Sequence, residues 1–259
     1  MGIYNCEQYL DAAIESLLSQ SFQDFKIIMC DDGSVDGTYM IAKKYASAHS
    51  NITLLKNEKN LGLNASLNRC IEYADTEFIA RMDADDISLH DRFMKQVSFL
   101  DTHLEISFVS TGMRCFDESG TFGDMIISKK VPEANDFIRT SPFYHAPTLF
   151  RTSALKEVGG YTVDRKLLRV EDYHLWFKFY QAGYKGYNMD DVLYMVREDR
   201  NAVSRRNFRN RLNECYVKLI GYKMIGISWY FYPFCIEPIV KYLAPKFLYN
   251  HYHKKNNLR

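Results

Sequence analysis

FKIIMCDDGSVDGT, residues 25–38, is the stretch that decides the fold. Its apolar run over 25–30 ends at Asp31 and Asp32, as expected of a buried strand that stops at a turn, and a helical pattern follows over 36–48. The same order recurs in two further pairs, with strands at 52–56 and 78–82 and helices at 64–74 and 90–100. Strands that alternate with helices of this length indicate a parallel sheet with helices on both faces.

The rest of the chain extends this α/β pattern. Further elements are expected as a helix at 7–20, strands at 106–111 and 122–127, and helices at 151–158 and 171–182. The opening MGIYN (1–5) is turn-like where a βαβ unit requires a strand, so we expect the first strand to be largely missing from the given chain. The sequence therefore predicts one α/β domain over 1–200 with a mostly parallel sheet, and a helical tail over 201–259.

Charge is divided between these two parts. Residues 1–196 carry 20 Lys and Arg against 28 Asp and Glu, a net charge of −8, whereas residues 197–259 carry 13 against 4, a net charge of +9. The acidic body would repel phosphate and no recognition motif is present, which disfavours nucleic acid, so we expect no nucleic-acid partner. The six cysteines show no metal-ligand or redox spacing, which is typical of reduced thiols in a cytoplasmic protein.

The run MDADD (82–86) is the first candidate for chemistry. Asp83 and Asp85 are two apart, so their carboxylates lie on one side of an extended segment, where they repel unless a cation or ligand intervenes. Mg²⁺ or Mn²⁺ suits such a place, because these ions are held by one or two carboxylates plus substrate phosphates. The alternative is a solvated acidic turn that caps the following helix.

Two further acidic segments carry the same ambiguity. In CDDGSVDGT (30–38), Asp32 is placed to accept hydrogen bonds from a nucleobase or ribose, although an ordinary strand-to-helix turn also explains the segment. In RVEDYHLWFKF (169–179), Glu171 and Asp172 stand where an apolar helix begins. A carboxylate there either serves as a general base for a hydroxyl acceptor or caps the helix.

Together these segments resemble a known family. The ordered blocks are IYNCEQYLDAAIESLLSQSF (3–22), CDDGSVDGT (30–38), NLGLNASLNRCIEYA (60–74), IARMDADD (79–86), HAPTLFRTSALKEVGGY (145–161) and VEDYHLWFKF (170–179). They resemble the family-2 inverting glycosyltransferases of bacterial polysaccharide assembly (capsule, O-antigen or exopolysaccharide), which have the type-A glycosyltransferase fold. The resemblance covers roughly residues 1–200.

The resemblance implies a role for each matched residue. It implies nucleotide-sugar contacts from Ile3, Tyr4, Asn5, Glu7, Asp32, Asp83 and Arg197, metal ligation by Asp85, catalysis by Asp172, and acceptor contacts from His145 and Glu171. The implied reaction is metal-dependent transfer of a hexose from a UDP-sugar to a hydroxyl of a lipid-linked or growing glycan. Mn²⁺ or Mg²⁺ assists the leaving nucleotide, and one displacement inverts the anomeric carbon. The alternative is a non-catalytic, membrane-peripheral assembly protein that keeps the fold.

The tail suggests where the protein works. Its cations mingle with the aromatic run IGISWYFYPFC (225–235), which is too short to span a bilayer and contains Pro233. Such a mixture suits the lipid headgroup layer, so an anionic membrane surface is the expected partner. The alternative is a helical hairpin packed on the catalytic domain. The sequence thus predicts a peripheral protein on the cytoplasmic face of the plasma membrane.

Overall fold

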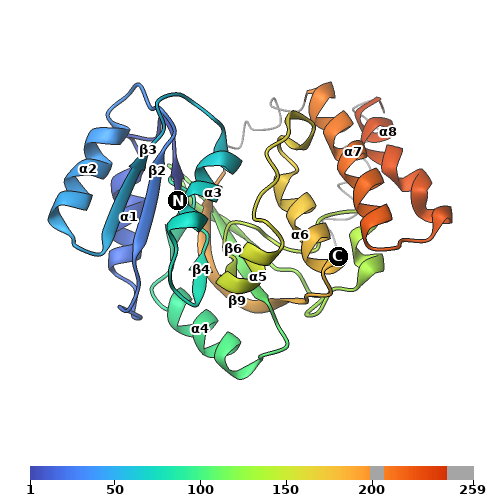
Figure 1. The fold of residues 1–259 in the computed structure, drawn as a ribbon, viewed down its shortest axis with the longest axis horizontal. Helices are drawn as coiled ribbons and strands as arrows, with labels where there is room; N and C mark the ends of the chain where they lie inside the picture. Colours follow the sequence, from blue (N-terminus) through green and yellow to red (C-terminus); the bar gives the residue numbers. More distant parts are fainter. Residues whose placement is uncertain (199–206, 244–259) are drawn as a thin grey trace.

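A computed structural model describes residues 1–198 and 207–243 of the chain. Its first sheet is wholly parallel, in the order β1-β2-β3. The strands are β1 (Gly2–Ile3), β2 (Ile27–Asp31) and β3 (Ile52–Lys56). Helices α1 (Leu10–Leu18), α2 (Thr38–Ala48) and α3 (Leu63–Tyr73) cover this sheet (Figure 1).

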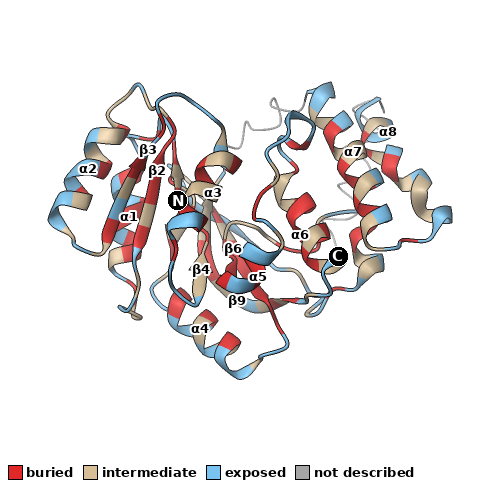
Figure 2. Ribbon diagram, viewed as in Figure 1, coloured by how far each residue is buried: buried red, intermediate tan, exposed pale blue. Residues whose placement is uncertain are grey.

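The helix α1 shows why the alternation folds in this way. Its apolar residues recur at helical spacing, and Leu10, Ala13 and Ile14 are fully buried. They join the core cluster that includes Met29 of β2, so one helical face covers the strand predicted from its apolar run. Most of β2 is buried, whereas in β3 Ile52 and Leu55 are buried and Thr53 and Lys56 are exposed (Figure 2).

The second sheet is mixed, in the order β4-β8-β6-β9-β5, with β7 paired to β6. Its strands are β4 (Phe78–Ala80), β5 (Ile87–Ser88), β6 (Phe108–Asp117), β7 (Gly120–Met125), β8 (Leu149–Arg151) and β9 (Gly186–Arg197). In this sheet β6 and β9 pair in parallel, and the other strand pairs are antiparallel. Helix α4 (Arg92–Thr102) follows β5.

A helical group completes the fold on the other side of this sheet (Figure 1). It contains η1 (Ala134–Phe137), α5 (Thr152–Glu157), η2 (Arg165–Leu167), α6 (Glu171–Gln181), α7 (Phe208–Met224), η4 (Trp229–Ile236) and α8 (Glu237–Leu243). Its core is aromatic, with Trp176, Phe177 and Phe179 of α6 fully buried. Val217 and Tyr222 of α7 belong to the same core cluster, so α7 packs directly on α6.

The predicted fold class is confirmed, with a short first strand as expected, since β1 consists of two residues. The strands β2 to β4 and helices α1 to α4 and α6 lie close to their predicted positions. The sequence did not predict β5, β8 and β9. At 151–158, where one helix was expected, the end of β8 leads directly into α5. The second sheet is also mixed rather than parallel.

Candidate active site

Five aspartates, three of them predicted to carry chemistry, lie at the carboxyl ends of two strands. Asp31 ends β2 and Asp32 follows it, while Asp83, Asp85 and Asp86 follow β4. Ligands of open α/β sheets bind beyond this edge, where strand order changes and neighbouring loops diverge. The two acidic loops belong to different sheets, so the site lies where the sheets meet.

The N-terminal turn is locked onto the loop after β2. Asn5 has φ +46 and its amide N–H donates to Ser34 Oγ at 3.1 Å, while Val35 N donates back to Asn5 Oδ1 at 3.0 Å. Glu7 accepts a hydrogen bond from the Gly37 amide. Asn5 and Glu7 therefore shape this edge of the site through contacts within the chain.

The two neighbours of this turn differ in their access to a ligand. Ile3 is 1% exposed and lies in the β1–β2 pairing, so its side chain serves the core. Tyr4 is 45% exposed, which leaves its ring able to contact a nucleotide.

The carboxylate of Asp32 is occupied by donors from the chain itself, one side-chain amide and two backbone amides. It is 3% exposed, and Asn57 Nδ2 and Leu61 N donate to its Oδ1 at 2.7 and 2.9 Å. Gly62 N donates to its Oδ2 at 2.8 Å. These three bonds hold the loop that leads into α3, the kind of multiple N–H contact that stabilises an ionised carboxylate.

Asp31 is a residue that sequence reasoning missed. It is 0% exposed, and neither of its carboxylate oxygens has a hydrogen-bond partner among the described residues. A buried carboxylate without a donor is costly, so such a group points to a partner that the chain itself does not supply. The doubled aspartate is visible in the sequence, and the nucleotide contact predicted for Asp32 stays a prediction.

We predict that the two aspartates give opposite results on substitution. Asp32→Ala removes an acceptor from three donors and should lower the free energy of unfolding by about 3 kcal/mol or more, measured by urea unfolding. Asp31→Asn should leave unfolding nearly unchanged and weaken UDP binding in calorimetry. Wild-type stability of Asp32→Ala together with lost UDP binding would instead assign nucleobase contact to Asp32.

The acidic run after β4 contains three carboxylates in different environments. Asp83 forms an ion pair with the buried guanidinium of Arg81, and Asp85 is exposed. Asp86 is 2% exposed and accepts a hydrogen bond from Arg197 N at 2.7 Å. Burial and then the charge of Asp83 raise the pKa of both Asp85 and Asp86, that of Asp86 to about 7. A nearby cation would relieve this accumulated negative charge.

Arg197 lies against the same run. Its guanidinium stacks on the rings of Tyr9 and Phe116, with centroids 4.2 and 4.5 Å away. Its Nε donates to the backbone oxygen of Asp85 at 3.2 Å, and Glu118 lies 3.6 Å from its Nη1. The end of β9 thus brings a cation to the acidic turn from more than a hundred residues away.

The acceptor-side residues form a second group. His145 Nε2 lies 2.6 Å from Tyr161 Oη, and burial followed by the positive charge of Arg81 holds the pKa of His145 well below its ordinary value. Asp172 is in the first turn of α6. Desolvation, then the neighbouring charge of Glu171, raises the pKa of Asp172 to about 6. That value is well matched to a base working near neutral pH.

Polar atoms on this side remain without partners. Glu171 Oε2 and Trp176 Nε1 are buried and have no hydrogen-bond partner in the described part of the chain. The His145 ring lies edge-on to Trp176, with centroids 5.9 Å apart. These unused groups border the base and fit a site that binds polar hydroxyls.

Arg81 connects the two groups, and sequence reasoning missed it. Its side chain is 7% exposed and paired with Asp83, and its charge acts on both His145 and Asp172. Its Nε is buried without a partner among the described residues. A basic residue two positions before Asp83 was visible in the sequence, but only the fold shows that it faces both sides of the site.

A resident metal site is not preformed in the described residues, where no three His, Cys, Asp or Glu side chains come together as a cation cage. The arrangement fits a cation held jointly with a substrate. Asp85 is exposed, and the raised pKa values of Asp85 and Asp86 mark an excess of negative charge. Mg²⁺ and Mn²⁺ are commonly held by one or two carboxylates together with substrate phosphates.

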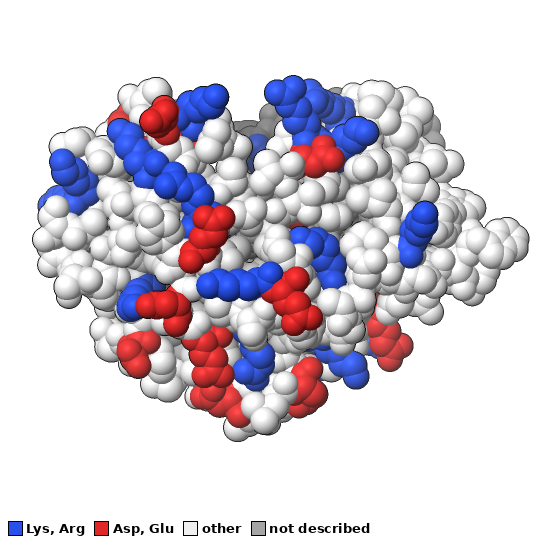
Figure 3. All heavy atoms as spheres, viewed as in Figure 1, with Lys and Arg blue, Asp and Glu red and all other residues white. Residues whose placement is uncertain are grey.

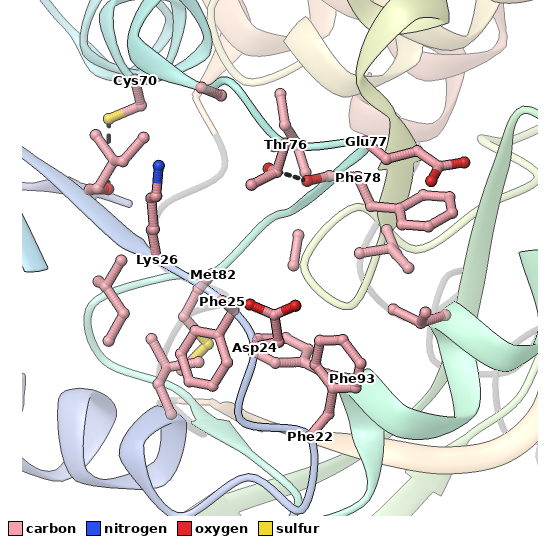
Figure 4. Close-up of a pocket in the computed structure, with 18 of the residues that line it drawn as sticks. Phe22, Asp24, Phe25, Lys26, Cys70, Thr76, Glu77, Phe78, Met82 and Phe93 are labelled. Carbon is pink, nitrogen blue, oxygen red and sulfur yellow. Dashed lines mark hydrogen bonds between the residues drawn. The ribbon is translucent and has the colours of Figure 1, made fainter. Parts of the chain in front are cut away.

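A separate cavity of about 500 Å³ lies away from this chemistry, between β2 and β4 (Figure 4). Its lining is mainly apolar, including Phe25, Met82 and Phe93, with Lys26 and Asp75 paired at 2.7 Å among the lining residues. It borders the start of β2, whereas the acidic loop lies at the end of that strand.

Comparison with known proteins connects this geometry to a family. The model of glycosyl transferase family 2 matches residues 1–159, which include both acidic loops. The chain belongs to glycosyl transferase family 2. It is therefore a glycosyltransferase, and the family predicted from its ordered motifs is confirmed.

Relatives of this glycosyltransferase cover nearly all of the chain. EpsE of Bacillus subtilis, which is named as a glycosyltransferase, is 41% identical over 256 residues, covering 98% of this chain and 92% of EpsE. A UDP-Gal:alpha-D-GlcNAc-diphosphoundecaprenol beta-1,3-galactosyltransferase of Escherichia coli is 29% identical over 212 residues, covering 80% of this chain and 75% of that enzyme.

A solved structure supports the fold. TarS of S. aureus (residues 1–349), crystallised in complex with UDP, superposes with a TM-score of 0.65 at 21% sequence identity. The match covers 86% of this chain and 68% of that one. At this identity the likeness establishes the type-A glycosyltransferase architecture and leaves the roles of individual residues to the geometry above.

Proposed function

We propose that this glycosyltransferase transfers a hexose from a UDP-sugar, with inversion, to a hydroxyl of a lipid-linked or growing glycan in bacterial polysaccharide assembly. The observation that carries the proposal is the ion pair of the buried Arg81 with Asp83, together with the effect of the same guanidinium charge on the carboxyl of Asp172. The charge of Arg81 therefore influences both Asp83, in the acidic run proposed to bind the nucleotide diphosphate through a cation, and Asp172, the proposed base with a raised pKa. The lipid-diphosphate acceptor named for the E. coli relative supports this acceptor class.

In the proposed reaction, Asp172 takes the proton of the acceptor hydroxyl as the acceptor oxygen bonds to the anomeric carbon. The bond from that carbon to the diphosphate oxygen breaks, UDP departs, and the centre is inverted. Asp85 would hold Mn²⁺ or Mg²⁺, which supplies Lewis-acid stabilisation of the leaving diphosphate. Tyr4 and Asp31 would bind the nucleotide, with Arg197 at the diphosphate. His145 and Glu171 would face the acceptor.

The test is UDP release from a panel of UDP-sugars by the purified full chain, with and without EDTA. We expect one donor to be hydrolysed in a metal-dependent manner, and transfer to a lipid-linked acceptor to give a product of inverted anomeric configuration by NMR. Retention of configuration would exclude the single displacement. Absence of turnover with every donor would favour the non-catalytic alternative.

The proposal includes a membrane surface as partner. We propose that residues 1–200 form the catalytic domain and that the tail, residues 201–259, contacts the membrane. The described part of the tail exposes Trp229, Tyr230, Ile236, Val240 and Leu243, the first of them 83% exposed. In Figure 3 few charged side chains appear at the right of the view, where Figure 1 places α8. Aromatic and apolar residues in such an arrangement suit the interface of a bilayer. No helix in the described ranges is long and apolar enough to cross a membrane.

The tail also packs on the catalytic domain. One face of the tail therefore contacts the domain, and another is left for the proposed membrane contact. Lys218 is 4% exposed and donates to Arg139 O at 2.9 Å, which removes it from any lipid contact. Lys241 is paired with Glu237 at 2.8 Å. Phe231 and Phe234 are half-buried against the core and do not contribute as freely as Trp229. Arg205, Arg206 and 244–259 lie outside the described residues.

We predict that the full chain co-sediments with anionic vesicles at low salt, tail towards the lipid and acidic body in the cytoplasm. Binding should weaken in high salt without vanishing, because apolar burial persists when charges are screened. Trp229→Ala with Tyr230→Ala should weaken binding about tenfold. Tyr73→Ala, which removes a 57% exposed ring of α3, is the matched control. Full-length protein left in the supernatant at low salt would refute the membrane assignment.

A further inference from the structure

The segment 161–170, between α5 and α6, is held at both ends by asparagine side chains from distant helices. At its start, Asn68 of α3 exchanges two hydrogen bonds with the Tyr161 backbone, both 2.8 Å, and Asn64 donates to Thr162 O at 2.9 Å. At its end, Nδ2 of Asn213 in α7 donates to Leu168 O at 3.0 Å. We call 161–170 the bridging segment.

The end held by Asn213 leads directly into the proposed base. Arg169 has φ +69, a left-handed conformation that a residue with a side chain rarely adopts without support. Val170, 5% exposed, is the N-cap of α6, and Glu171 and Asp172 form the first turn. A hydrogen bond to the carbonyl of Leu168 therefore fixes the backbone just before the strained residue and the catalytic turn.

Asn213 itself is held rigidly. It is 6% exposed on α7, whose Val217 is fully buried in the aromatic core. At Gly221 the helix comes so close to Phe177 of α6 that an added Cβ would lie 2.2 Å from ring carbons. Tyr222 donates from its hydroxyl to the carbonyl of Ile138. The donor of the Asn213 hydrogen bond thus belongs to a well-packed helix.

We propose that Asn213 is a positioning residue for Asp172, and that α7 forms part of the acceptor-side apparatus through the bridging segment. This inference rests on the proposed role of Asp172. The start of the segment carries Tyr161, whose hydroxyl meets His145 at 2.6 Å. Asn68 and Asn213 therefore act on opposite ends of one segment, the first towards His145 and the second towards Asp172.

The test compares Asn213→Ala with Leu219→Ala, which changes a 49% exposed residue on the same helix. For Asn213→Ala we expect kcat for transfer to fall about 10- to 100-fold, since small misplacements of catalytic groups have effects of this size. UDP affinity should change less than about twofold. The acid limb of the transfer pH profile should move to lower pH, because a loosened turn admits water and relieves the desolvation of Asp172. Leu219→Ala should match the wild type in all three.

Hydrogen exchange over residues 164–172 gives a readout that does not depend on turnover. Asn213→Ala should speed exchange there while α1 to α3 stay unchanged. If the wild-type chain shows no transferase activity while Asn213→Ala still exchanges faster, the proposed function fails, but the role of Asn213 in holding the segment stands. Wild-type kcat and pH limb in Asn213→Ala would overturn the positioning role. Should Asn213→Ala fail to fold, Asn213→Gln, which keeps the amide donor, must fold and show the wild-type kcat and acid limb. A folded Asn213→Gln with kcat lowered about 10- to 100-fold would overturn the proposal equally.

Discussion

Asp172→Asn is expected to bind UDP-sugar and metal normally and to lose transfer by about 10²–10⁴-fold, the usual contribution of a general base. The amide has nearly the same shape but cannot take the acceptor proton. UDP affinity by calorimetry and initial rates of transfer measure the two properties separately. A variant within a few-fold of the wild type would return Asp172 to the role of a helix cap.

The pKa of Asp172 also predicts how transfer and stability change with pH. Burial raises that pKa to about 6, so the carboxyl is protonated and inactive below this pH. Wild-type transfer should therefore rise with pH through about 6 and then level. The pKa of Asp172 in the folded chain exceeds the ordinary value of about 4. Ionisation of Asp172 therefore lowers the free energy of unfolding as pH rises from about 4 to about 6, and the full loss remains above pH 6. Asp172→Asn should consequently be as stable as the wild type, or more so, at pH 7 by thermal unfolding.

Asp85→Asn is expected to abolish metal-stimulated UDP release. Asp85 is the exposed carboxylate of the acidic run, whereas Asp83 is paired with Arg81 and Asp86 is occupied by Arg197 N. Loss of the Asp85 charge would remove the carboxylate proposed to bind the cation that accompanies the diphosphate. The variant should fold normally, because substitution relieves repulsion from Asp83.

Titration of Mn²⁺ by its paramagnetic signal in the presence of UDP measures the effect directly. We expect the Mn²⁺ affinity of Asp85→Asn to fall at least about tenfold. Asp101→Asn, which neutralises an exposed carboxylate on α4, is the control and should bind as the wild type does. Equal Mn²⁺ binding by Asp85→Asn and Asp101→Asn would place the cation elsewhere.

The sequence alone determined the strand–helix alternation of the first hundred residues, apart from β5, and the identity of the family. β3 was predicted at its observed bounds, 52–56, because a short apolar run between turns has one stable use beside helices that bury their apolar faces. The family could be predicted because six motifs in a fixed order are far more specific than any one of them. The antiparallel β8 escaped prediction since three residues that run into α5 carry no period of their own.

Tertiary structure decided how the polar groups are used. Nothing in the letters of CDDGS distinguishes Asp32, which accepts three hydrogen bonds from 57–62, from Asp31, which accepts none within the described chain. The effect of the Arg81 charge on Asp172, and the hydrogen bond from Asn213 to Leu168 O, likewise join residues far apart in sequence. Periodicity reports which side chains leave water, because burial follows local geometry, whereas partner and pKa depend on the few atoms that the fold brings within about 3 Å.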